Sequence, residues 1–172
     1  MQIGFLVDQS KCVGCKACEI ACKNRNQLGV GPRLREVIQV ESGTYPDVTV
    51  MNLSMACMHC GKPACMAVCP AGAITKRSED GVVLVDQKKC IGCRYCFFAC
   101  PFGVPQYRQD GTMIKCDFCQ EFLAIGKDPA CVATCMYDAL HYGTLAELTE
   151  MARQKTATNL AQATQPSMIV VK

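Results

Sequence analysis

The chain has 172 residues, a formal charge of +3 and a hydrophobic fraction of 50%. Sixteen residues are cysteine, a share that is typical of either a disulfide scaffold or a protein whose cysteines bind metal. No run of 18 or more apolar residues occurs, which excludes a membrane-spanning helix from the prediction.

The N-terminal residues predict where the protein works. Residues 1–12, MQIGFLVDQSKC, lack the basic and apolar regions of a secretory leader. We therefore expect a cytoplasmic protein, and a reducing compartment argues against a dense disulfide framework. The alternative is a periplasmic position at the membrane face, reached by export in folded form with a partner that carries the leader.

Short strands dominate the predicted secondary structure. Apolar runs predict strands at residues 3–8, 34–40, 48–55 and 138–143, and a hairpin of strands 71–75 and 82–86 around a turn at 79–81. Short helices are expected to follow the last cysteine of each cysteine group described below, as in residues 16–26.

The C-terminal part of the sequence predicts a helix followed by a polar segment, which we call the strap. Thr144 and Glu147 form a capping box, which predicts the start of a helix. Its core face should consist of Leu145, Leu148, Met151 and Ala152. Residues 153–172 are a polar strap that ends in the strand-like MIVVK. We expect the strap either to be a disordered end or to lie on a partner, with Met168–Val171 adding a strand to that partner's sheet edge.

The cysteines fall into four groups of four, with none left over. Groups one and three follow the ferredoxin spacing C-x2-C-x2-C-x3-C, and groups two and four are the same run with an insertion between the second and third cysteines. In chain order the groups are Cys12, Cys15, Cys18 and Cys22; Cys57, Cys60, Cys65 and Cys69; Cys90, Cys93, Cys96 and Cys100; and Cys116, Cys119, Cys131 and Cys135.

This spacing suits a cubane cluster. Two-residue gaps let a tight loop wrap three corners of the cube, and Gly14 and Gly92 tolerate the positive φ that such a loop needs. The fourth cysteine leaves on a short helix and reaches the neighbouring cluster. Zinc sites usually take two well-separated CxxC pairs, whereas the third cysteine of groups one and three follows after only two residues. We therefore predict four 4Fe–4S clusters in which every iron has a protein thiolate.

Metal binding also changes the meaning of the positive charge. Bound cysteine is thiolate, so each cluster site contributes about −2 and four sites bring the holoprotein to about −5. Lysine and arginine are spread along the chain without a long basic run. The sequence therefore predicts no nucleic-acid partner.

Two prolines indicate which groups pair. Groups two and three both end in Cys-Pro, at Pro70 and Pro101, and the predicted hairpin joins them as in a complete two-cluster ferredoxin. Groups one and four have Lys23 and Met136 at that position and pair by elimination. One ferredoxin module is then inserted inside another. A sequential pairing, one with two and three with four, stays open as the alternative.

The nested pairing gives ligand sets, domains and a fold class. Cluster 1 would be held by Cys12, Cys15, Cys18 and Cys135; cluster 2 by Cys57, Cys60, Cys65 and Cys100; cluster 3 by Cys90, Cys93, Cys96 and Cys69; and cluster 4 by Cys116, Cys119, Cys131 and Cys22. Residues 1–50 and 110–152 form the outer module, residues 51–109 the inserted module and residues 153–172 the strap. The fold class is α+β, with nested ferredoxin-like modules of short helices and β-hairpins.

No residue pattern predicts catalysis by this chain. His59 lies between two ligands and is expected to pack or to hydrogen-bond, with tuning of a cluster potential as the alternative. The basic residues Lys11, Lys16, Lys89 and Arg94 flank ligands. We interpret them as solvated surface residues or, alternatively, as charges that raise the reduction potential of the neighbouring cluster. The sequence predicts a carrier of single electrons.

A family resemblance rests on three segments, MACMHCGKPACMAVCPAGAITKRSEDGVV, CIGCRYCFFACPFGVPQY and IKCDFC. Over about residues 3–145 the chain resembles the four-cluster iron–sulfur subunits of molybdenum- and tungsten-pterin oxidoreductases. The resemblance implies nested pairing and a non-catalytic electron-transfer subunit beside a Mo/W-pterin catalytic subunit. Some family members have a tryptophan ligand position and a three-iron cluster, but group three is complete here, so four cubanes are expected.

The resemblance leaves more than one complex open. The short chain without an anchor favours a soluble tungsten aldehyde oxidoreductase, with an FAD-containing subunit as redox partner and copies of this chain joined into a longer electron path. The segment ACPFGVPQY favours a dimethyl sulfoxide or polysulfide reductase with a membrane anchor that oxidises quinol. A different class is a free-standing polyferredoxin or a redox sensor, although no signalling domain is visible in the sequence.

Overall fold

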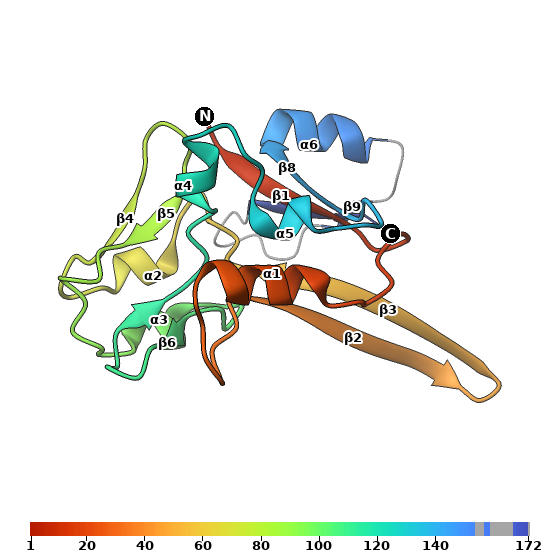
Figure 1. Cartoon of the computed structure of the whole chain (residues 1–172), viewed down its shortest axis with the longest axis horizontal. Coiled ribbons are helices and arrows are strands. Elements are labelled where there is room, and N and C mark those ends of the chain that lie inside the picture. Colours follow the sequence, from red (N-terminus) through yellow and green to blue (C-terminus); the bar gives the residue numbers. More distant parts are fainter. Residues whose placement is uncertain (154–156, 159–166, 172) are drawn as a thin grey trace.

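The largest sheet brings together strands from both ends of the chain. In the computed structural model, which describes residues 1–153, 157–158 and 167–171, strand β1 (Ile3–Asp8) lies between β8 (Leu140–Thr144) and β10 (Met168–Val171) (Figure 1). It pairs antiparallel with β8 and parallel with β10, and β9 (Ala157–Thr158) pairs with the other edge of β10. All six residues of β1 are buried, as its nearly continuous apolar sequence requires.

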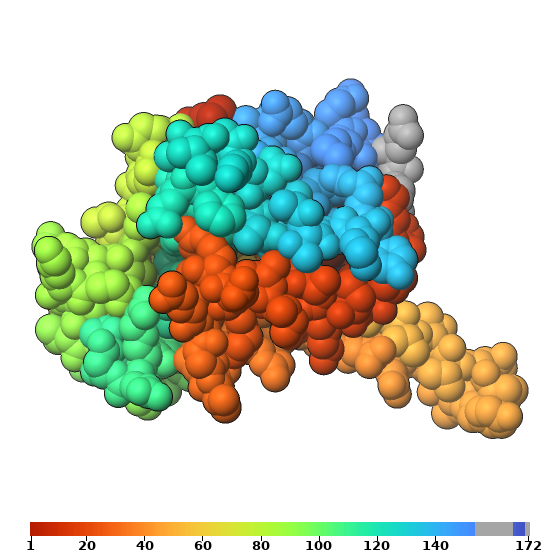
Figure 2. All heavy atoms as spheres, in the orientation of Figure 1, coloured from red at the N-terminus to blue at the C-terminus, as the bar shows by residue number. Residues whose placement is uncertain are grey.

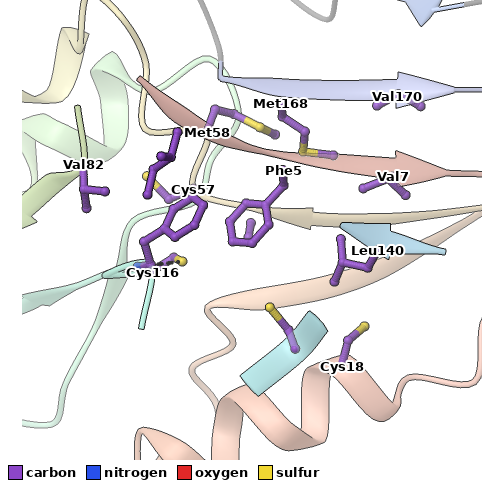
Figure 3. Packing of buried hydrophobic residues seen from close by; sticks show 14 of the residues in the cluster. Phe5, Val7, Cys18, Cys57, Met58, Val82, Cys116, Leu140, Met168 and Val170 are labelled. Atoms are coloured by element: carbon purple, nitrogen blue, oxygen red, sulfur yellow. Dashed lines mark hydrogen bonds between the residues drawn. The ribbon is translucent and has the colours of Figure 1, made fainter. Parts of the chain in front are cut away.

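This sheet corrects the prediction for the C-terminus. Met168 and Val170 are both buried, and they pack in the same core as Phe5 and Val7 of β1 (Figure 3). The apolar run therefore covers an edge of its own chain, and the expectation that it adds a strand to a partner is wrong for Met168–Val171. The rest of the strap, residues 154–156, 159–166 and 172, lies outside the described residues.

Helix α6 (Leu145–Ala152) begins where the capping box predicts. The Thr144 hydroxyl accepts a hydrogen bond from the Glu147 N–H at 3.2 Å, and the Glu147 carboxylate accepts one from the Thr144 N–H at 2.8 Å. Leu148 and Ala152 pack against Leu6 of β1. Met151 was expected on this face but is half exposed, because the helix presents only a narrow stripe to the sheet.

A long hairpin projects from the body of the molecule. Strands β2 (Arg35–Thr44) and β3 (Asp47–Ala56) pair over their whole length, from Arg35 opposite Ala56 to Thr44 opposite Asp47 (Figures 1 and 2). They confirm the strands predicted at 34–40 and 48–55 and extend them to the tip. The hairpin also crosses the expected module boundary at residues 50 and 51.

The remaining strands are two small hairpins. β4 (Ile74–Lys76) pairs with β5 (Val83–Val85), which confirms the predicted hairpin with shorter strands. β6 (Gln106–Tyr107) pairs with β7 (Met113–Ile114).

Most of the short helices lie one step earlier in the chain than predicted. They are α1 (Ala17–Arg25), α2 (Ala64–Ala67), α3 (Tyr95–Ala99), α4 (Gln120–Leu123) and α5 (Ala130–Ala133). Except for α4, each begins immediately before the third cysteine of a group. The helix expected at residues 16–26 is confirmed as α1, which contains the fourth cysteine of its group. The helices α2, α3 and α5 instead lead to the fourth cysteine, so the expectation that they follow it is wrong.

The main core lies between the sheet and the cysteine loops. The Phe5 ring stacks on the Phe118 ring with centroids 4.2 Å apart, and both side chains are fully buried. Cys18, Cys57 and Cys116 belong to the same core (Figure 3). The α+β fold class with short helices and hairpins is confirmed.

Candidate metal centres

Three cavities are each lined by four cysteines. Their volumes are similar, about 390, 400 and 350 Å³ including the space at their mouths. We call them site 1 (Cys12, Cys15, Cys18 and Cys135), site 2 (Cys57, Cys60, Cys65 and Cys100) and site 3 (Cys69, Cys90, Cys93 and Cys96). In each site, three cysteines of one group meet the fourth cysteine of another.

The other four cysteines, Cys22, Cys116, Cys119 and Cys131, form site 4. All four are buried. Burial is the main cause that raises the pKa of the Cys22 thiol to about 12, and the nearby Cys131 and Cys119 raise it further. Burial likewise raises the pKa of Cys116, with Cys57 and Cys22 as the next contributors. Bound iron would supply the positive charge that lets such thiols ionise.

Helix contacts group the sites into two pairs. Helix α1 of group one contacts α5 of group four, and α2 of group two contacts α3 of group three (Figure 1). At the end of α1, the Arg25 guanidinium lies 2.8 Å from the carboxylate of Asp117, which sits between Cys116 and Cys119. Groups one and four therefore meet in space although about 90 residues separate them in the chain.

Left-handed residues bend each loop around its cavity. Gly14 and Gly92 have φ of 70° and 69°, as the sequence predicted. A Cβ atom on Gly14 would lie 2.5 Å from the Asn52 Oδ1, and one on Gly92 would lie 2.8 Å from the Gly111 carbonyl oxygen. Lys16 and Arg94 are also left-handed, with φ of 60° and 67°, and each caps the helix that carries the third cysteine. That role of the two basic residues is not visible in the sequence.

Groups two and four share a different entry to their helices. Pro63 and Pro129 stand at the N-caps of α2 and α5, each followed by Ala-Cys. Proline favours the extended conformation that starts such a helix. Left-handed residues occur before the second cysteine in both groups, at His59 and Phe118. The insertions thus place the third cysteine in the same way in both groups.

Backbone N–H groups point at sulfur atoms in three of these sites. The N–H of Ala73 donates to the Cys69 Sγ at 3.3 Å and that of Met113 to the Cys90 Sγ at 3.3 Å, both in site 3. The N–H of Ala139 donates to the Cys135 Sγ of site 1 at 3.4 Å. In site 4 the N–H of Phe118 donates to the Cys116 Sγ at 3.4 Å. Such donors stabilise negative charge on sulfur and suit the thiolates of an iron–sulfur centre.

The donor set fits clusters better than single ions. Within residues 1–153, 157–158 and 167–171, no three histidine, cysteine or acidic side chains converge on one metal position. The cysteines instead surround a space, as the corners of a cubane require. Sulfur-only ligands in this number favour iron–sulfur centres.

Two buried cations lie beside the sites, and neither was recognised from the sequence. Arg35 is 2% exposed, and its charge acts on Cys131, Cys116, Cys18 and Cys22 of sites 1 and 4. Lys115 is 5% exposed, lines the cavity of site 2 and donates to the carbonyl oxygens of Val83 and Cys116. Lys115 comes directly before the ligand Cys116 in the sequence, and this position could have identified it as a residue beside a site.

The flanking basic residues named by the sequence are mostly exposed. Lys11 pairs with Asp138 at 3.1 Å, and the Lys89 amine lies 3.9 Å from Asp86. Arg94 stacks over the Tyr107 ring at 5.0 Å beside site 3. Lys16 and Arg94 add the capping role given above.

His59 is a packed, neutral side chain. Its Nδ1 accepts a hydrogen bond from the Val83 N–H at 3.0 Å, and its ring meets Phe118 edge-on at 5.3 Å. Burial lowers its pKa well below the usual histidine value, and Lys115, Lys76 and Arg35 lower it further. Packing and hydrogen bonding, the first expectation, describe its contacts.

The fold and its cysteine sites define an electron carrier of the ferredoxin type. Residues 48–145 match a family described as 4Fe–4S dicluster domain, and residues 11–73 match a second family with the same description. No helix within the described residues is both long and apolar enough to cross a membrane.

Similar proteins indicate more closely which kind of iron–sulfur protein this is. The protein is 45% identical to a probable subunit of anaerobic dimethyl sulfoxide reductase from Escherichia coli (strain K12), over 96% of its own length and 82% of the relative. It is 46% identical to the B subunit of anaerobic dimethyl sulfoxide reductase from the same strain, over 86% and 76%. The iron–sulfur subunit of the nitrate-inducible formate dehydrogenase of that strain is 33% identical, over 91% and 59%.

The chain belongs to the 4Fe–4S dicluster family of iron–sulfur subunits found in molybdenum-pterin oxidoreductases of the dimethyl sulfoxide reductase and formate dehydrogenase type. It is a non-catalytic electron-transfer subunit, and its sixteen cysteines in two dicluster domains match four 4Fe–4S clusters. These parts of the sequence prediction are confirmed.

Proposed function

We propose that the chain binds one 4Fe–4S cluster at each of sites 1 to 4 with the nested ligand sets. The observation that carries this proposal is that three separate cavities are each lined by four cysteines in that arrangement. The α1–α5 and α2–α3 contacts favour the same pairing over the sequential one. The cysteines of the chain would hold the clusters, and the main core around Cys18, Cys57 and Cys116 would shield them partly from water.

The four sites form a path in the order 1, 4, 2, 3. Sites 1 and 4 share the α1–α5 contact, and sites 2 and 3 share the α2–α3 contact. The two pairs meet where Cys116 of site 4 lies near Cys57 of site 2 in the main core (Figure 3). The exposed ligands Cys15 and Cys93 belong to the terminal sites 1 and 3. Single electrons would therefore enter at one end and leave at the other.

Both ends carry apolar surface that suits protein partners. Val13 borders the site 1 cavity and Ile91 the site 3 cavity, and both are more than half exposed. Phe98, close in sequence to the site 3 ligands, is 81% exposed. Exposed apolar rims of this kind are typical of interaction sites.

The partners that we propose are a molybdenum-pterin catalytic subunit and a membrane anchor that oxidises quinol. The dimethyl sulfoxide reductase subunits among the relatives favour this alternative over the aldehyde oxidoreductase with tungsten and FAD that the sequence favoured. Joining of copies is not part of the proposal, because Met168–Val171 pair within the chain. The cytoplasmic location stays a prediction.

We also propose revised module boundaries. The outer module would take in the whole β2–β3 hairpin, since Ser54 of β3 contacts Cys18 of site 1 at 3.4 Å. It would also include β10, which completes the sheet of β1. The inserted module would then begin at Cys57, the first ligand of site 2.

Metal analysis tests the cluster proposal. Protein purified without oxygen should contain about sixteen iron and about sixteen acid-labile sulfide per chain. Reductive titration followed by electron paramagnetic resonance (EPR) should show four one-electron steps. Stoichiometric zinc without iron would contradict the proposal.

The native complex tests the partners. We expect it to contain a molybdenum-pterin subunit, to sediment with membranes and to be reduced by a quinol. A soluble complex that contains FAD would favour the aldehyde oxidoreductase alternative. A single species of 18.7 kDa from native cells would favour a free polyferredoxin.

A further inference from the structure

Arg35 is a fully buried cation at the start of the projecting hairpin. Its guanidinium carbon lies 4.6 Å from the centre of the Phe5 ring. Its Nη1 donates to the Ser54 Oγ at 3.0 Å and approaches the Ser54 carbonyl oxygen at 3.4 Å. Its Nη2 is buried and has no hydrogen-bond partner in the described part of the chain.

No carboxylate pairs with this cation within the described residues. The acidic side chain that reaches the hairpin nearby is Glu19, and it is engaged elsewhere. One oxygen of its carboxylate accepts a hydrogen bond from the Val37 N–H, and the other lies 4.0 Å from the Arg33 guanidinium. Arginine stays protonated in proteins, and an unpaired buried charge is strongly unfavourable. Arg35 therefore needs another source of negative charge.

The cysteines of two sites are that source. As thiolates, Cys131 and Cys116 of site 4 would act most strongly on Arg35, followed by Cys18 of site 1 and Cys22 of site 4. The Ser54 hydroxyl joins the guanidinium to site 1, since its Oγ lies 3.0 Å from Nη1 and 3.4 Å from the Cys18 Sγ. Once these cysteines hold clusters, both sites carry net negative charge, which increases on reduction.

We propose that Arg35 is the shared counter-ion of sites 1 and 4, and that its charge holds the reduction potentials of their clusters above the values the same ligands would otherwise give. This proposal rests on the proposed function. Arg35 acts as a positioning residue, since it reaches the clusters through its field and through Ser54. A buried charge is weakly screened, so its effect should exceed that of any exposed cation near a site.

Arg33 provides a matched control. It is an arginine two residues before Arg35, its guanidinium lies 3.3 Å from the Glu36 carboxylate, and it lines none of the three cysteine cavities. Unlike Arg35, it is exposed to solvent. The pair therefore separates burial of the charge from the mere presence of an arginine.

The experiment compares Arg35→Gln, Arg35→Met, Arg35→Lys and Arg33→Gln as full chains with clusters bound. EPR-monitored redox titration gives each midpoint potential, and iron content gives the loading. We expect both neutral Arg35 variants to disfavour reduction of the clusters at sites 1 and 4 at least tenfold, which is about 59 mV for a one-electron couple. Sites 2 and 3 should shift much less. Arg35→Lys should keep the potentials close to those of the wild type, and Arg33→Gln should change every potential by less than about threefold in the equilibrium constant.

Three outcomes would overturn the proposal. The first is unchanged potentials in a fully loaded Arg35→Met protein, which would show that the side chain only fills space. The second is a similar defect in Arg35→Lys and Arg35→Met, which would show that shape matters and charge does not. The third is an equal shift in Arg33→Gln. If the neutral variants fail to load sites 1 and 4 whereas Arg35→Lys loads them, the need for the charge is supported. Wild-type protein without four clusters would instead contradict the proposed function.

Discussion

The two site pairs use the same kind of cysteine loops but differ in how they are covered. Sites 1 and 4 lie under the sheet of β1, β8 and β10, and five of their eight cysteines are buried. Sites 2 and 3 lie beside hairpins whose strands are only two or three residues long, and two of their eight cysteines are buried. The loop geometry therefore defines where a cluster binds, whereas the surrounding fold decides how dry its environment is.

Because of this difference, the two site pairs should be sensitive to different substitutions. The outer pair depends on long-range packing of Phe5 and Phe118 and on a buried arginine. The inner pair depends more on its own loops and presents exposed aromatic residues such as Phe98 at the surface. Substitutions in the sheet should therefore affect sites 1 and 4 first.

The largest effect should come from removing a ligand that joins two distant groups. Cys22→Ala should abolish the cluster bound with Cys116, Cys119 and Cys131, and lower iron from about sixteen to about twelve per chain. Cys100→Ala is the counterpart in the inner pair and should lose the site 2 cluster instead. Iron analysis and EPR check both. Loss of a cluster held by group two in Cys22→Ala would support the sequential pairing.

The next largest effect should come from truncating a side chain of the main core. Phe118→Ala removes a fully buried ring that stacks on Phe5, and we expect a loss of about 3–5 kcal/mol in stability. Phe98→Ala is the control, because Phe98 is 81% exposed, and it should change stability by less than about 0.5 kcal/mol. Guanidinium unfolding without oxygen measures both. Equal effects would show that the outer core does not depend on this stack.

A smaller effect tests the C-terminal strand. Val170→Thr buries a hydroxyl at a 3% exposed position and should destabilise the outer module by about 1–3 kcal/mol. Val48→Thr, near the tip of the projecting hairpin, is the matched change at a half-exposed valine and should be close to neutral. Thermal unfolding separates them. No effect of Val170→Thr would show that Met168–Val171 do not cover β1.

The smallest expected effect concerns the cap of α6. Thr144→Ala removes the hydroxyl that accepts from the Glu147 N–H and should cost about 1 kcal/mol. Thr149→Ala, at an exposed position inside the same helix, should be neutral or slightly stabilising, because alanine favours helix. Comparable losses in both variants would show that the cap contributes nothing of its own. Thermal unfolding again provides the measurement.

Local patterns allowed much of this molecule to be predicted. The cysteine spacing identified every cysteine that borders a site, and the capping box located α6. Gly14 and Gly92 were recognised because only a loop with positive φ explains them between ligands. Each of these signals lies within a few residues of the feature that it predicts.

What the sequence did not reveal depends on distant contacts. Nothing in the run Met168–Val171 states which strand it will join, so its place beside β1 could not be derived. Arg35 stands in an alternating strand, which predicts a surface residue, yet it is buried because residues distant in the sequence, Phe5 among them, cover it. The left-handed Lys16 and Arg94 were also missed, because neither residue type signals that conformation.

The position of β1 has a consequence for the order of events during synthesis. The ribosome makes β1 long before its two neighbours, β8 and β10, which emerge only with residues 140–144 and 168–171. The sheet over the outer sites is therefore complete only after Val171 has been made, and their last ligand is Cys135, whereas all ligands of sites 2 and 3 are available once Cys100 has left the exit tunnel. We expect the inner pair to be ready for its clusters before the outer pair.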